Sequence, residues 1–505
     1  MSTNENRKAK TVEHVDVIIV GAGLSGIGAA CHLKTECPQK SFVILEGRGV
    51  MGGTWDLFRY PGVRSDSDMY TLGYNFRPWR DPKAIADGPA ILSYIHDTAR
   101  EYDVDKAIRY NHRVRSARWS SDDARWTVEA ESDKTIVRLS CNFLYLCTGY
   151  YDYERGYTPE WQGVERFRGT IVHPQKWPED LDYTGKRIVV IGSGATAITL
   201  VPAIAERAAH VTMLQRSPSY IVTRPGQDVI ANLLRRCLPD RAVYGVTRWK
   251  NVLTGTFFYN LARNRPKVFK WMVARGVRRQ LGKGYDAKDF TPPYNPWDQR
   301  LCIAPDADIF RVLREGRASV VTDSIETFTE DGLLLKSGRQ LDADIIVTAT
   351  GLVLKIISGM HLVVDDKTID LPKTLVYKGM MFSDVPNLAF AIGYTNASWT
   401  LKCDLASQYV CRLLNYMDRH GYAVCTPRVN DPGIGDEPVI DFNSGYVLRS
   451  LDTLPRQGSK TPWRLHQNYM KDLSMMRYGR VDDSAMEFKR APIAQRARTE
   501  AVASV

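Results

Sequence analysis

The sequence has little that marks a membrane-spanning, secreted or metal-binding protein. Its nine cysteines are scattered over 505 residues and none form a CxxC pair, which argues against a zinc ribbon, a redox dithiol or a disulfide scaffold. No apolar run approaches the roughly 18 residues that span a bilayer. The polar start, MSTNENRKAKTVEHVD, has no apolar core for a signal peptide. We therefore expect a cytoplasmic protein without a metal site.

The positive charge is distributed unevenly. The net charge is +11, and residues 226–289 alone hold 14 Lys or Arg against four Asp. No recognised nucleic-acid module surrounds this segment, so nucleic acid is not an expected partner. Three interpretations of this basic segment stay open: a solvated helical face, an oligomer contact, or a surface that binds anionic lipid at the inner face of the cell membrane.

Two strand–turn–helix units dominate the pattern. VDVIIVGAGLSGIGAACHLK and SFVILEGRG form the first, and KRIVVIGSGATAITLVPAIAE and HVTMLQRS form the second. A short apolar run, a Gly-rich turn and a helical pattern are typical of dinucleotide-binding β-α-β units. A chain of this length is also too long for one core. The sequence therefore predicts an α/β fold with two Rossmann-like domains.

The first Gly-rich turn has the full GxGxxG spacing, at Gly21, Gly23 and Gly26. The first glycine permits a tight turn, the second a close approach of the backbone to pyrophosphate, and the third close packing of helix on strand. Ser25 can donate to a phosphate in the same loop. Glu46 ends the next strand about 20 residues on, where a carboxylate accepts from ribose hydroxyls. The turn predicts a dinucleotide site.

The segment GGTWDLFRYPGVRSD, residues 52–66, extends this site. Its glycines permit close approach to a flat ligand, and Trp55 offers a stacking face. The turn at Pro61 and Gly62 aims the following polar side chains at one place. As a plain loop it would not need so many glycines and aromatics.

The second turn reads GxGxxA, at Gly192, Gly194 and Ala197. The strand that follows ends with Arg216 and Ser217, where Glu46 stands in the first unit. A guanidinium pairs with a 2′-phosphate that a carboxylate would repel, and a hydroxyl adds a donor. The exchange predicts NADPH, although Arg216 as a solvated surface charge stays an alternative.

One stretch near the second turn, FRGTIVHPQKWP, is too broken for a helix and too irregular for a clean strand. It fits the motif Phe-x-Gly-x-x-x-His-x-x-x-Trp-Pro through Phe167, Gly169, His173, Trp177 and Pro178. The segment from 52 to 66 fits a second motif through Gly53, Trp55, Tyr60, Pro61, Gly62 and Asp66. On these motifs the chain resembles the flavin-dependent Baeyer–Villiger monooxygenases from about residue 15 to about 486, and especially the mycobacterial subgroup that activates the thioamide ethionamide.

The resemblance implies the positions of the cofactor contacts. FAD contacts would fall on Ser25, Glu46, Thr54, Trp55, Asp56, Leu57, Asp66 and Val114. NADP contacts would fall on Arg64, Ser65, Asp66, Ser193, Gly194, Ala195, Thr196, Ala197, Ile198, Thr199, Arg216 and Ser217. The catalytic arginine of the family matches Arg300 in WDQRLC, and Asp66 is the natural partner to hold its guanidinium. Val353 departs from the more polar residue common in relatives.

The resemblance and the patterns together predict the domain order. The FAD-binding domain would comprise 1–150 and 346–485, the NADP-binding domain 151–224 and 296–345, with a helical basic insertion at 225–295 and a C-terminal tail at 486–505. The motif from Phe167 to Pro178 would be a linker that couples domain movement to cofactor position. His173 would act there by hydrogen bonding, since it has no second ligand for a metal.

The implied reaction uses FAD, NADPH and dioxygen to convert ketones into esters or lactones, and it would also oxygenate sulfides and thioamides. A fixed cation such as Arg300 would stabilise the anionic species that form. Two alternatives stay open: a flavin-containing monooxygenase that oxidises only nitrogen and sulfur, and a flavin-binding scaffold without turnover. The missing CxxC disfavours a disulfide reductase.

Overall fold

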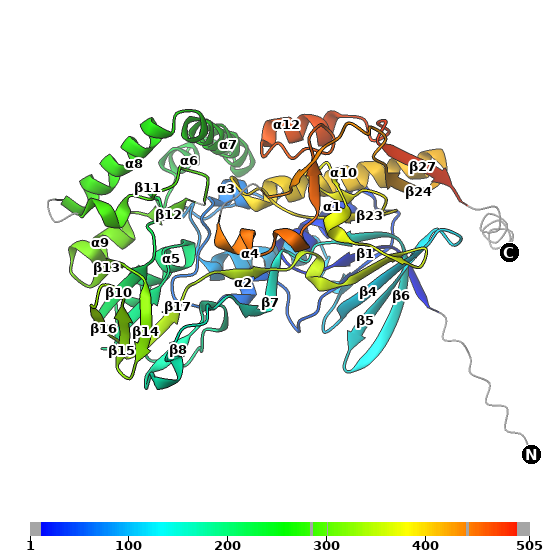
Figure 1. Cartoon of the computed structure of the whole chain (residues 1–505). Helices are drawn as coiled ribbons and strands as arrows, with labels where there is room; N and C mark the ends of the chain where they lie inside the picture. The colour runs from blue at the N-terminus through cyan, green and yellow to red at the C-terminus, as the bar shows by residue number, and fades with distance from the viewer. Residues whose placement is uncertain (1–11, 283–285, 300, 441–443, 492–505) are drawn as a thin grey trace, which may run out of the picture.

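The computed structural model describes residues 12–282, 286–299, 301–440 and 444–491. The chain forms two lobes side by side, each with a sheet at its centre, and a pair of long helices lies along the upper edge of one lobe (Figure 1). The architecture is the predicted α/β fold with two Rossmann-like units and a helical insertion.

The first lobe contains a nine-stranded sheet in the order β20-β19-β4-β5-β6-β1-β2-β3, with β23 also paired to β6. The strands are β1 (Glu13–Val20), β2 (Phe42–Leu45), β3 (Ile108–Arg109), β4 (Arg113–Ser120), β5 (Arg125–Ser132), β6 (Thr135–Leu146), β19 (His361–Val364), β20 (Lys367–Thr368) and β23 (Leu388–Phe390). In β1, Val17 and Ile19 enter one core, while Ile18 and Val20 enter the core on the other face. Both faces of the strand are therefore covered, which explains its continuous apolar run.

Helices cover one face of this sheet. They are α1 (Leu24–Glu36), α4 (Gly88–Glu101) and α10 (Trp399–His420). Helix α1 packs against α10, although the two lie far apart in the sequence (Figure 1). All residues from Leu24 to Leu33 are buried, because the helix lies between the sheet and α10. A helix enclosed in this way needs apolar or small residues on all sides.

The second lobe contains a five-stranded parallel sheet in the order β13-β10-β9-β17-β8. The strands are β8 (Thr170–Val172), β9 (Arg187–Ile191), β10 (His210–Gln215), β13 (Ala318–Thr322) and β17 (Ile345–Thr348), with α5 (Ala195–Ile204) and α9 (Asp308–Arg314) as helices. A small sheet of β14 (Ile325–Thr329), β15 (Gly332–Leu335) and β16 (Gln340–Asp342) lies beside it. The stretch from Phe167 to Pro178, which the sequence described as too irregular for a clean strand, contains the three-residue β8, and this short strand pairs with β17 at the sheet edge.

The chain passes between the lobes at two places that lie together. Strand β7 (Tyr151–Gly156) follows the first lobe's CTGY sequence, and β18 (Leu352–Leu354) follows the second lobe's TATG sequence. The two strands pair antiparallel. The small residues before them therefore lie where the chain crosses between the two units.

The described part of the predicted insertion contains the α-helices α6 (Val229–Leu234), α7 (Asp240–Asn264) and α8 (Pro266–Leu281) and a 3-10 helix at Ala287–Phe290. Asp228 caps α6 by accepting from the N–H of Ala231, and Pro266 starts α8, where a missing N–H costs nothing. Helix α7 packs on the short α3 (Met69–Leu72) of the first lobe. Within the described residues, no helix is long and apolar enough to cross a membrane.

One predicted domain boundary falls inside a strand, and another coincides with the start of a strand. The boundary after residue 345 divides β17, all of which belongs to the second sheet. The tail predicted from residue 486 begins with β27 (Met486–Arg490), which pairs with β24 (Tyr422–Pro427). The other short elements are α2 (Thr54–Leu57), β11 (Ile221–Arg224), β12 (Cys302–Pro305), β21 (Val376–Tyr377), β22 (Met381–Phe382), β25 (Asp436–Pro438), α11 (Gly445–Leu448), β26 (Arg456–Gly458) and α12 (Tyr469–Leu473).

Candidate active site

The first Gly-rich turn joins β1 to α1 under tight steric limits. Gly21 has φ +104°, and a Cβ there would lie 2.6 Å from the carbonyl oxygen of Cys147. A Cβ on Gly26 would overlap the carbonyl oxygen of Gly21. Gly23 faces Gly53, and its N-cap position has no side-chain cap for the N–H groups of α1. These amides are donors for an anionic group at the helix start.

Glu46 lies just after β2 and is fixed by the backbone around it. Its carboxylate accepts from the N–H of Ala22 at 2.8 Å and from the N–H of Arg48 at 2.9 Å. Burial raises the pKa of this carboxyl, and the two backbone hydrogen bonds act in the opposite direction. Each oxygen keeps further acceptor capacity. Glu46 therefore lies where the sequence placed a ribose acceptor.

A cavity of about 380 Å³ opens at this turn. The predicted contacts that line it are Gly21, Gly23, Ser25, Glu46, Thr54, Trp55, Arg64, Ser65, Asp66 and Val114. Gly26 supports the turn from behind rather than lining the cavity. Ten predicted positions from four separate segments thus meet at one place.

Two predicted FAD contacts, Asp56 and Leu57, are not among the lining residues. Asp56 is buried and forms ion pairs with Arg48 at 2.6 Å and Arg59 at 2.5 Å. The carboxylate is therefore engaged in holding the Gly-rich loop against its neighbours. Thr54 and Trp55, one and two residues earlier, face the cavity instead.

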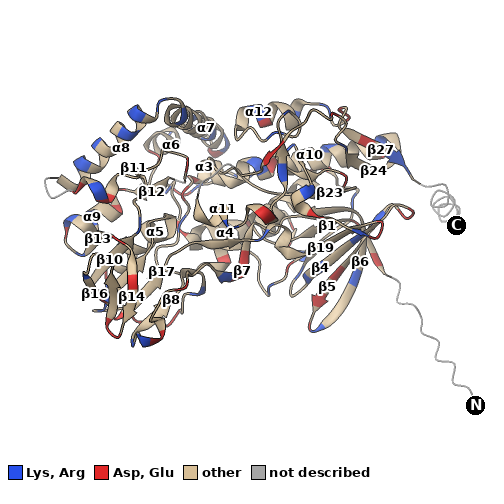
Figure 2. Cartoon of the chain, viewed as in Figure 1, with Lys and Arg blue, Asp and Glu red and all other residues tan. Residues whose placement is uncertain are grey.

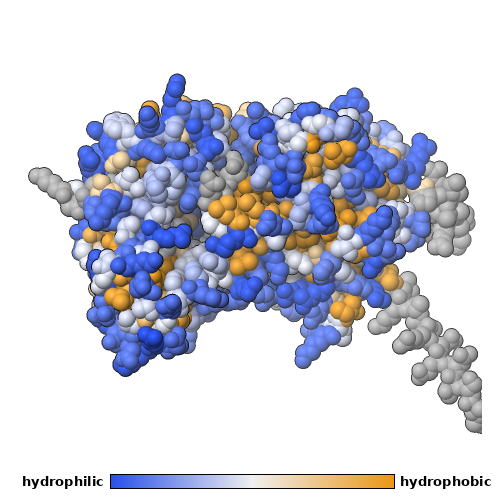
Figure 3. All heavy atoms as spheres, in the orientation of Figure 1, coloured by the Kyte–Doolittle hydropathy of each residue, from blue (hydrophilic) through white to orange (hydrophobic). Residues whose placement is uncertain are grey.

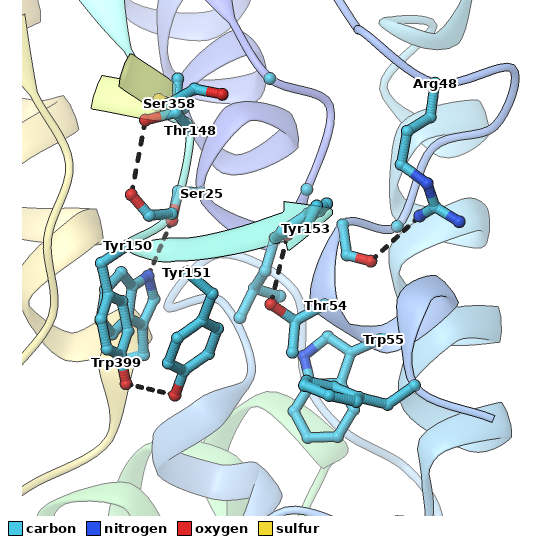
Figure 4. Close-up of a pocket in the computed structure, with 18 of the residues that line it drawn as sticks. Ser25, Arg48, Thr54, Trp55, Thr148, Tyr150, Tyr151, Tyr153, Ser358 and Trp399 are labelled. Atoms are coloured by element: carbon cyan, nitrogen blue, oxygen red, sulfur yellow. Dashed lines mark hydrogen bonds between the residues drawn. The ribbon is translucent and has the colours of Figure 1, made fainter. Parts of the chain in front are cut away.

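Aromatic side chains form one wall of this cavity, as the close-up shows (Figure 4). The indole Nε1 of Trp399 donates to Oγ of Ser25 at 2.8 Å, and the Trp399 ring stacks on Tyr150 with centroids 4.8 Å apart. The hydroxyls of Tyr150 and Tyr151 lie 2.5 Å apart. Tyr153 contacts Thr54 through its hydroxyl. No sequence motif assigned a role to these four aromatic residues.

The first cavity fits a flavin nucleotide in two respects. Arg64 lines it and pairs with Asp308 through Nη1, yet its Nε and Nη2 are buried without a hydrogen-bond partner among the described residues. Leaving buried guanidinium donors unpaired is costly, so these atoms favour an anionic or oxygen-rich ligand. The contact of Gly23 with Gly53 leaves no room for side chains between the turn and the loop. The residues present therefore fit a nucleotide such as FAD, and Arg64, predicted as an NADP contact, lies in this first cavity.

A second cavity of about 670 Å³ lies at the second Gly-rich turn. The predicted contacts that line it are Gly192, Ser193, Gly194, Ala195, Thr196, Arg216 and Ser217. Gly192 has φ +136°, and a Cβ there would overlap the carbonyl oxygen of Ala349. Ala197 and Ile198 are fully buried on α5, and Thr199 lines the first cavity instead. The start of the helix therefore faces the nucleotide, and its later residues do not.

Among the residues that the structure describes, three cations line this second cavity. Arg216 is exposed at the end of β10, and Lys336 from the end of β15 lines the same space. The guanidinium carbon of Arg449 lies 3.4 Å from the ring centroid of Tyr157, and burial lowers the pKa of Arg449, with Arg216 contributing by repulsion. Such an excess of positive charge favours a phosphate-bearing ligand. Lys336 was missed because no motif surrounds it in the sequence.

The two cavities share a wall. Tyr151, Ala195, Thr196 and Leu352 line both of them. Tyr151 and Leu352 belong to β7 and β18, the strands on which the chain passes between lobes. A ligand bound in either cavity therefore meets the same four residues.

The predicted catalytic pair is only partly described. Asp66 lines the first cavity, and burial, followed by the charge of Asp66, raises the pKa of Tyr60. Arg300 lies outside the described residues, while its neighbours Gln299 and Leu301 line the second cavity. Within the described residues, no group of three or more His, Cys, Asp or Glu could hold a metal ion.

The linker motif lies where the lobes meet. His173 Nε2 lies 3.3 Å from the carbonyl oxygen of Gly351, and its Nδ1 accepts from the N–H of Gln175 at 3.1 Å. Burial lowers the pKa of His173, which favours the neutral ring that these two roles require. Phe167 and Trp177 are buried in two separate cores of the second lobe. The aromatics thus anchor both ends, and His173 contacts the residue before β18.

Two Rossmann-like units whose cavities meet at one wall define a two-nucleotide flavoprotein. Residues 81–392 match a family described as flavin-binding monooxygenase-like, and residues 19–81 match an NAD(P)-binding Rossmann-like domain. The FAD-containing monooxygenase EthA of Mycobacterium tuberculosis is 56% identical over 95% of this chain and 99% of its own length. The putative FAD-containing monooxygenase MymA of the same organism is 54% identical over 95% of this chain and 98% of its own length.

Among solved structures, OTEMO in complex with FAD and NADP has the same fold, with a TM-score of 0.72 at 22% identity over 94% of this chain and 99% of its own. The chain belongs to the flavin-binding monooxygenase-like family. It is an NADPH-dependent flavoprotein monooxygenase with FAD and NADP as cofactors, and the resemblance drawn from its two motifs is confirmed.

Proposed function

We propose that this enzyme inserts one oxygen atom of dioxygen into ketones to give esters or lactones, and that it also oxygenates sulfur in sulfides and thioamides such as ethionamide. The observation that carries the proposal is the shared wall between the cavities, formed by Tyr151, Ala195, Thr196 and Leu352. Nucleotides held in the two cavities would share this wall, and a substrate bound against it would lie close to both. The similarity to EthA favours the same substrate chemistry.

FAD and NADPH, when bound, would supply the redox chemistry, with NADPH as the hydride donor and FAD as the group that reacts with dioxygen. The chain must bind both nucleotides, orient the substrate and exclude water. The half-buried aromatic wall of Tyr150, Tyr153 and Trp399 suits the last task. Charge develops on the carbonyl oxygen of a ketone during ester formation, and a permanent cation stabilises it more than the neutral ketone.

Arg300 is the cation that we assign to this role, with Asp66 as the residue that positions it. An arginine is suited because it cannot lose its charge. Asp66 contributes a carboxylate at the wall of the first cavity. In this assignment a neutral substitute at position 300 leaves nucleotide binding intact and removes the stabilisation of the substrate oxygen.

The test combines product analysis with NADPH consumption. The wild-type holoenzyme should consume NADPH in a ketone-stimulated, oxygen-dependent reaction and release an ester that mass spectrometry detects. Arg300→Ala should still reduce its flavin in anaerobic stopped flow but form no ester, and Arg300→Lys should recover part of the yield. Normal ester formation by Arg300→Ala would remove Arg300 from the reaction.

The second candidate is a monooxygenase that oxidises nitrogen and sulfur only. The match to the broader flavin-binding monooxygenase-like family favours it. A parallel panel of linear, cyclic and aryl ketones, an alkyl sulfide and a thioamide separates the two functions. Sulfoxide without any ester from every ketone would establish the second candidate in place of the first.

A further inference from the structure

The outer side of α7 carries large apolar side chains that the rest of the described chain covers only in part. Val246, Trp249, Leu253 and Phe257 are 53, 41, 55 and 61% exposed. Their spacing of three or four residues places them in one stripe along the helix. A surface helix of a globular protein normally has its apolar stripe turned to the core. An apolar stripe turned outward instead marks contact with another surface.

The inner side of α7 is fixed to the first lobe, so the exposed stripe cannot turn inward. The buried guanidinium of Arg248 donates to the carbonyl oxygens of Tyr70 at 2.9 Å and Gly73 at 2.8 Å, and it pairs with Asp404 at 3.3 Å. Breaking a buried pair of this kind is strongly unfavourable. The helix is therefore held with its apolar stripe facing away from the lobe.

Helix α8 continues the apolar surface and adds positive charge to it. Val268, Trp271 and Met272 are exposed in its first half. Three arginines follow Trp271 at helical spacing: Arg275, Arg278 and Arg279. The guanidinium of Arg275 lies 5.7 Å from the ring centroid of Trp271. The helix contains no acidic residue, and blue basic segments follow one another along it in Figure 2. None of its cations forms an ion pair with another described residue.

The surface formed by these side chains is termed the α7–α8 face. It comprises Val246, Trp249, Leu253, Phe257, Val268, Trp271, Met272, Arg275, Arg278 and Arg279. The two helices are consecutive and pack against each other, and both run along the upper edge of their lobe (Figure 1). In the view of Figure 3 this edge mixes hydrophilic and hydrophobic atoms, while a larger hydrophobic area lies in the middle of the molecule.

We propose that the α7–α8 face docks the enzyme on a bilayer that contains anionic phospholipids. Aromatic and aliphatic side chains enter the boundary between headgroups and acyl chains, and flanking Lys and Arg pair with anionic headgroups. Charge argues against a second copy of the chain as the occupant. A symmetric contact would place α8, with its cations and no anion, against the same positive surface of a molecule with net charge +11.

The first experiment measures sedimentation of the full-length holoenzyme with vesicles of phosphatidylcholine, with and without phosphatidylglycerol. Each basic residue near an anionic surface strengthens binding by about fivefold, so Arg275→Gln/Arg278→Gln/Arg279→Gln should weaken it about a hundredfold. The matched control, Lys134→Gln/Arg339→Gln/Lys367→Gln, removes the same charge from exposed positions on other elements. It should bind within about threefold of the wild type, since screening limits the range of each charge.

A second variant tests the apolar part of the face. Phe257→Ser/Trp271→Ser should weaken vesicle binding at high salt, where the electrostatic part is screened. Flavin content and NADPH oxidation with a water-soluble ketone should not change in either variant, which verifies folding.

Three results would overturn the proposal. In the first, the wild-type enzyme stays in the supernatant with phosphatidylglycerol vesicles. In the second, the control triple variant loses as much vesicle binding as the Arg275→Gln/Arg278→Gln/Arg279→Gln variant. In the third, the enzyme forms an oligomer without lipid, and Phe257→Ser/Trp271→Ser converts this oligomer to monomer. The last result would assign the face to a second copy of the chain.

Discussion

Replacement of Arg216 by Gln tests the choice of nucleotide most directly. Arg216 stands at the end of β10, where the first unit has Glu46, and it faces a cavity that Lys336 also lines. Glutamine keeps a side chain of similar length and can still donate hydrogen bonds, so the substitution removes mainly the charge. The 2′-phosphate is the part of NADPH that NADH lacks, and a charge effect should therefore appear with NADPH alone.

The expected magnitude follows from the exposure of the side chain. A hydrogen bond to a charged group contributes about 1.5–3 kcal/mol, and each 1.4 kcal/mol corresponds to about tenfold in affinity. Arg216 is exposed, so the lower end applies because water screens the pair. We expect KM for NADPH to rise about tenfold and KM for NADH to change by less than about twofold. Arg216→Gln/Lys336→Gln should lose about a further tenfold for NADPH.

The assay compares initial rates of NADPH and NADH oxidation at saturating ketone. Arg207→Gln is the matched control, because Arg207 is an exposed arginine of the same lobe that pairs with Asp182 and does not line the cavity. The control should keep the wild-type preference. An equal rise in KM for both nucleotides in Arg216→Gln would refute the assignment of this residue to the 2′-phosphate.

Three further predictions concern packing, pH and the linker. Gly26→Ala places a Cβ onto the carbonyl oxygen of Gly21 and should lower the free energy of unfolding by about 3 kcal/mol, with loss of bound flavin and a lower Tm. The control is Gly255→Ala, whose Cβ would have no atom within 4 Å and which should stabilise α7 by about 1 kcal/mol. Burial opposes protonation of His32, but hydrogen bonds to Asp404 and Glu36 outweigh it and raise its pKa to about 9. Protonated His32 therefore adds up to about 3 kcal/mol to the free energy of unfolding, and this stabilisation is complete below about pH 6.5 and lost as pH rises through about 9. Urea titrations of the wild type across that range should show the decline in stability. An equal decline in His32→Gln would contradict the assignment to His32. His173→Ala should slow turnover while flavin content stays unchanged, and unaltered kcat would exclude a coupling role for the linker.

The part of the site that could be predicted from the sequence consists of short segments whose residues are fixed by the local backbone geometry or by the charge of the ligand. At Gly21 and Gly192 the backbone has a positive φ and lies against a carbonyl group of another strand, so glycine is required there whatever the rest of the chain does. The exchange of Glu46 for Arg216 after the second strand is likewise readable, because both positions follow a fixed spacing from their turns. Such constraints are recorded in short stretches of sequence.

The residues that were missed come together only through the fold. Trp399 donates to Ser25 across 374 positions of sequence. Lys336 reaches the second cavity from a small separate sheet, and Tyr151 lines both cavities because β7 pairs with β18. Asp56 was a predicted FAD contact, but its carboxylate pairs with Arg48 and Arg59 and does not line the cavity. None of these contacts follows from local spacing.

By itself, then, the sequence determined two nucleotide-binding turns, the identity of their cofactors, the linker motif and the basic insertion. It did so because backbone geometry at a turn and the sign of a charge are properties of a few adjacent residues. Only the tertiary structure decided which aromatic side chains wall the first cavity, which lysine joins Arg216, and which side of α7 is exposed. These three features depend on packing between segments that are distant in the sequence. The same residue types could be buried in the core or exposed on the surface, so the sequence alone does not distinguish the two.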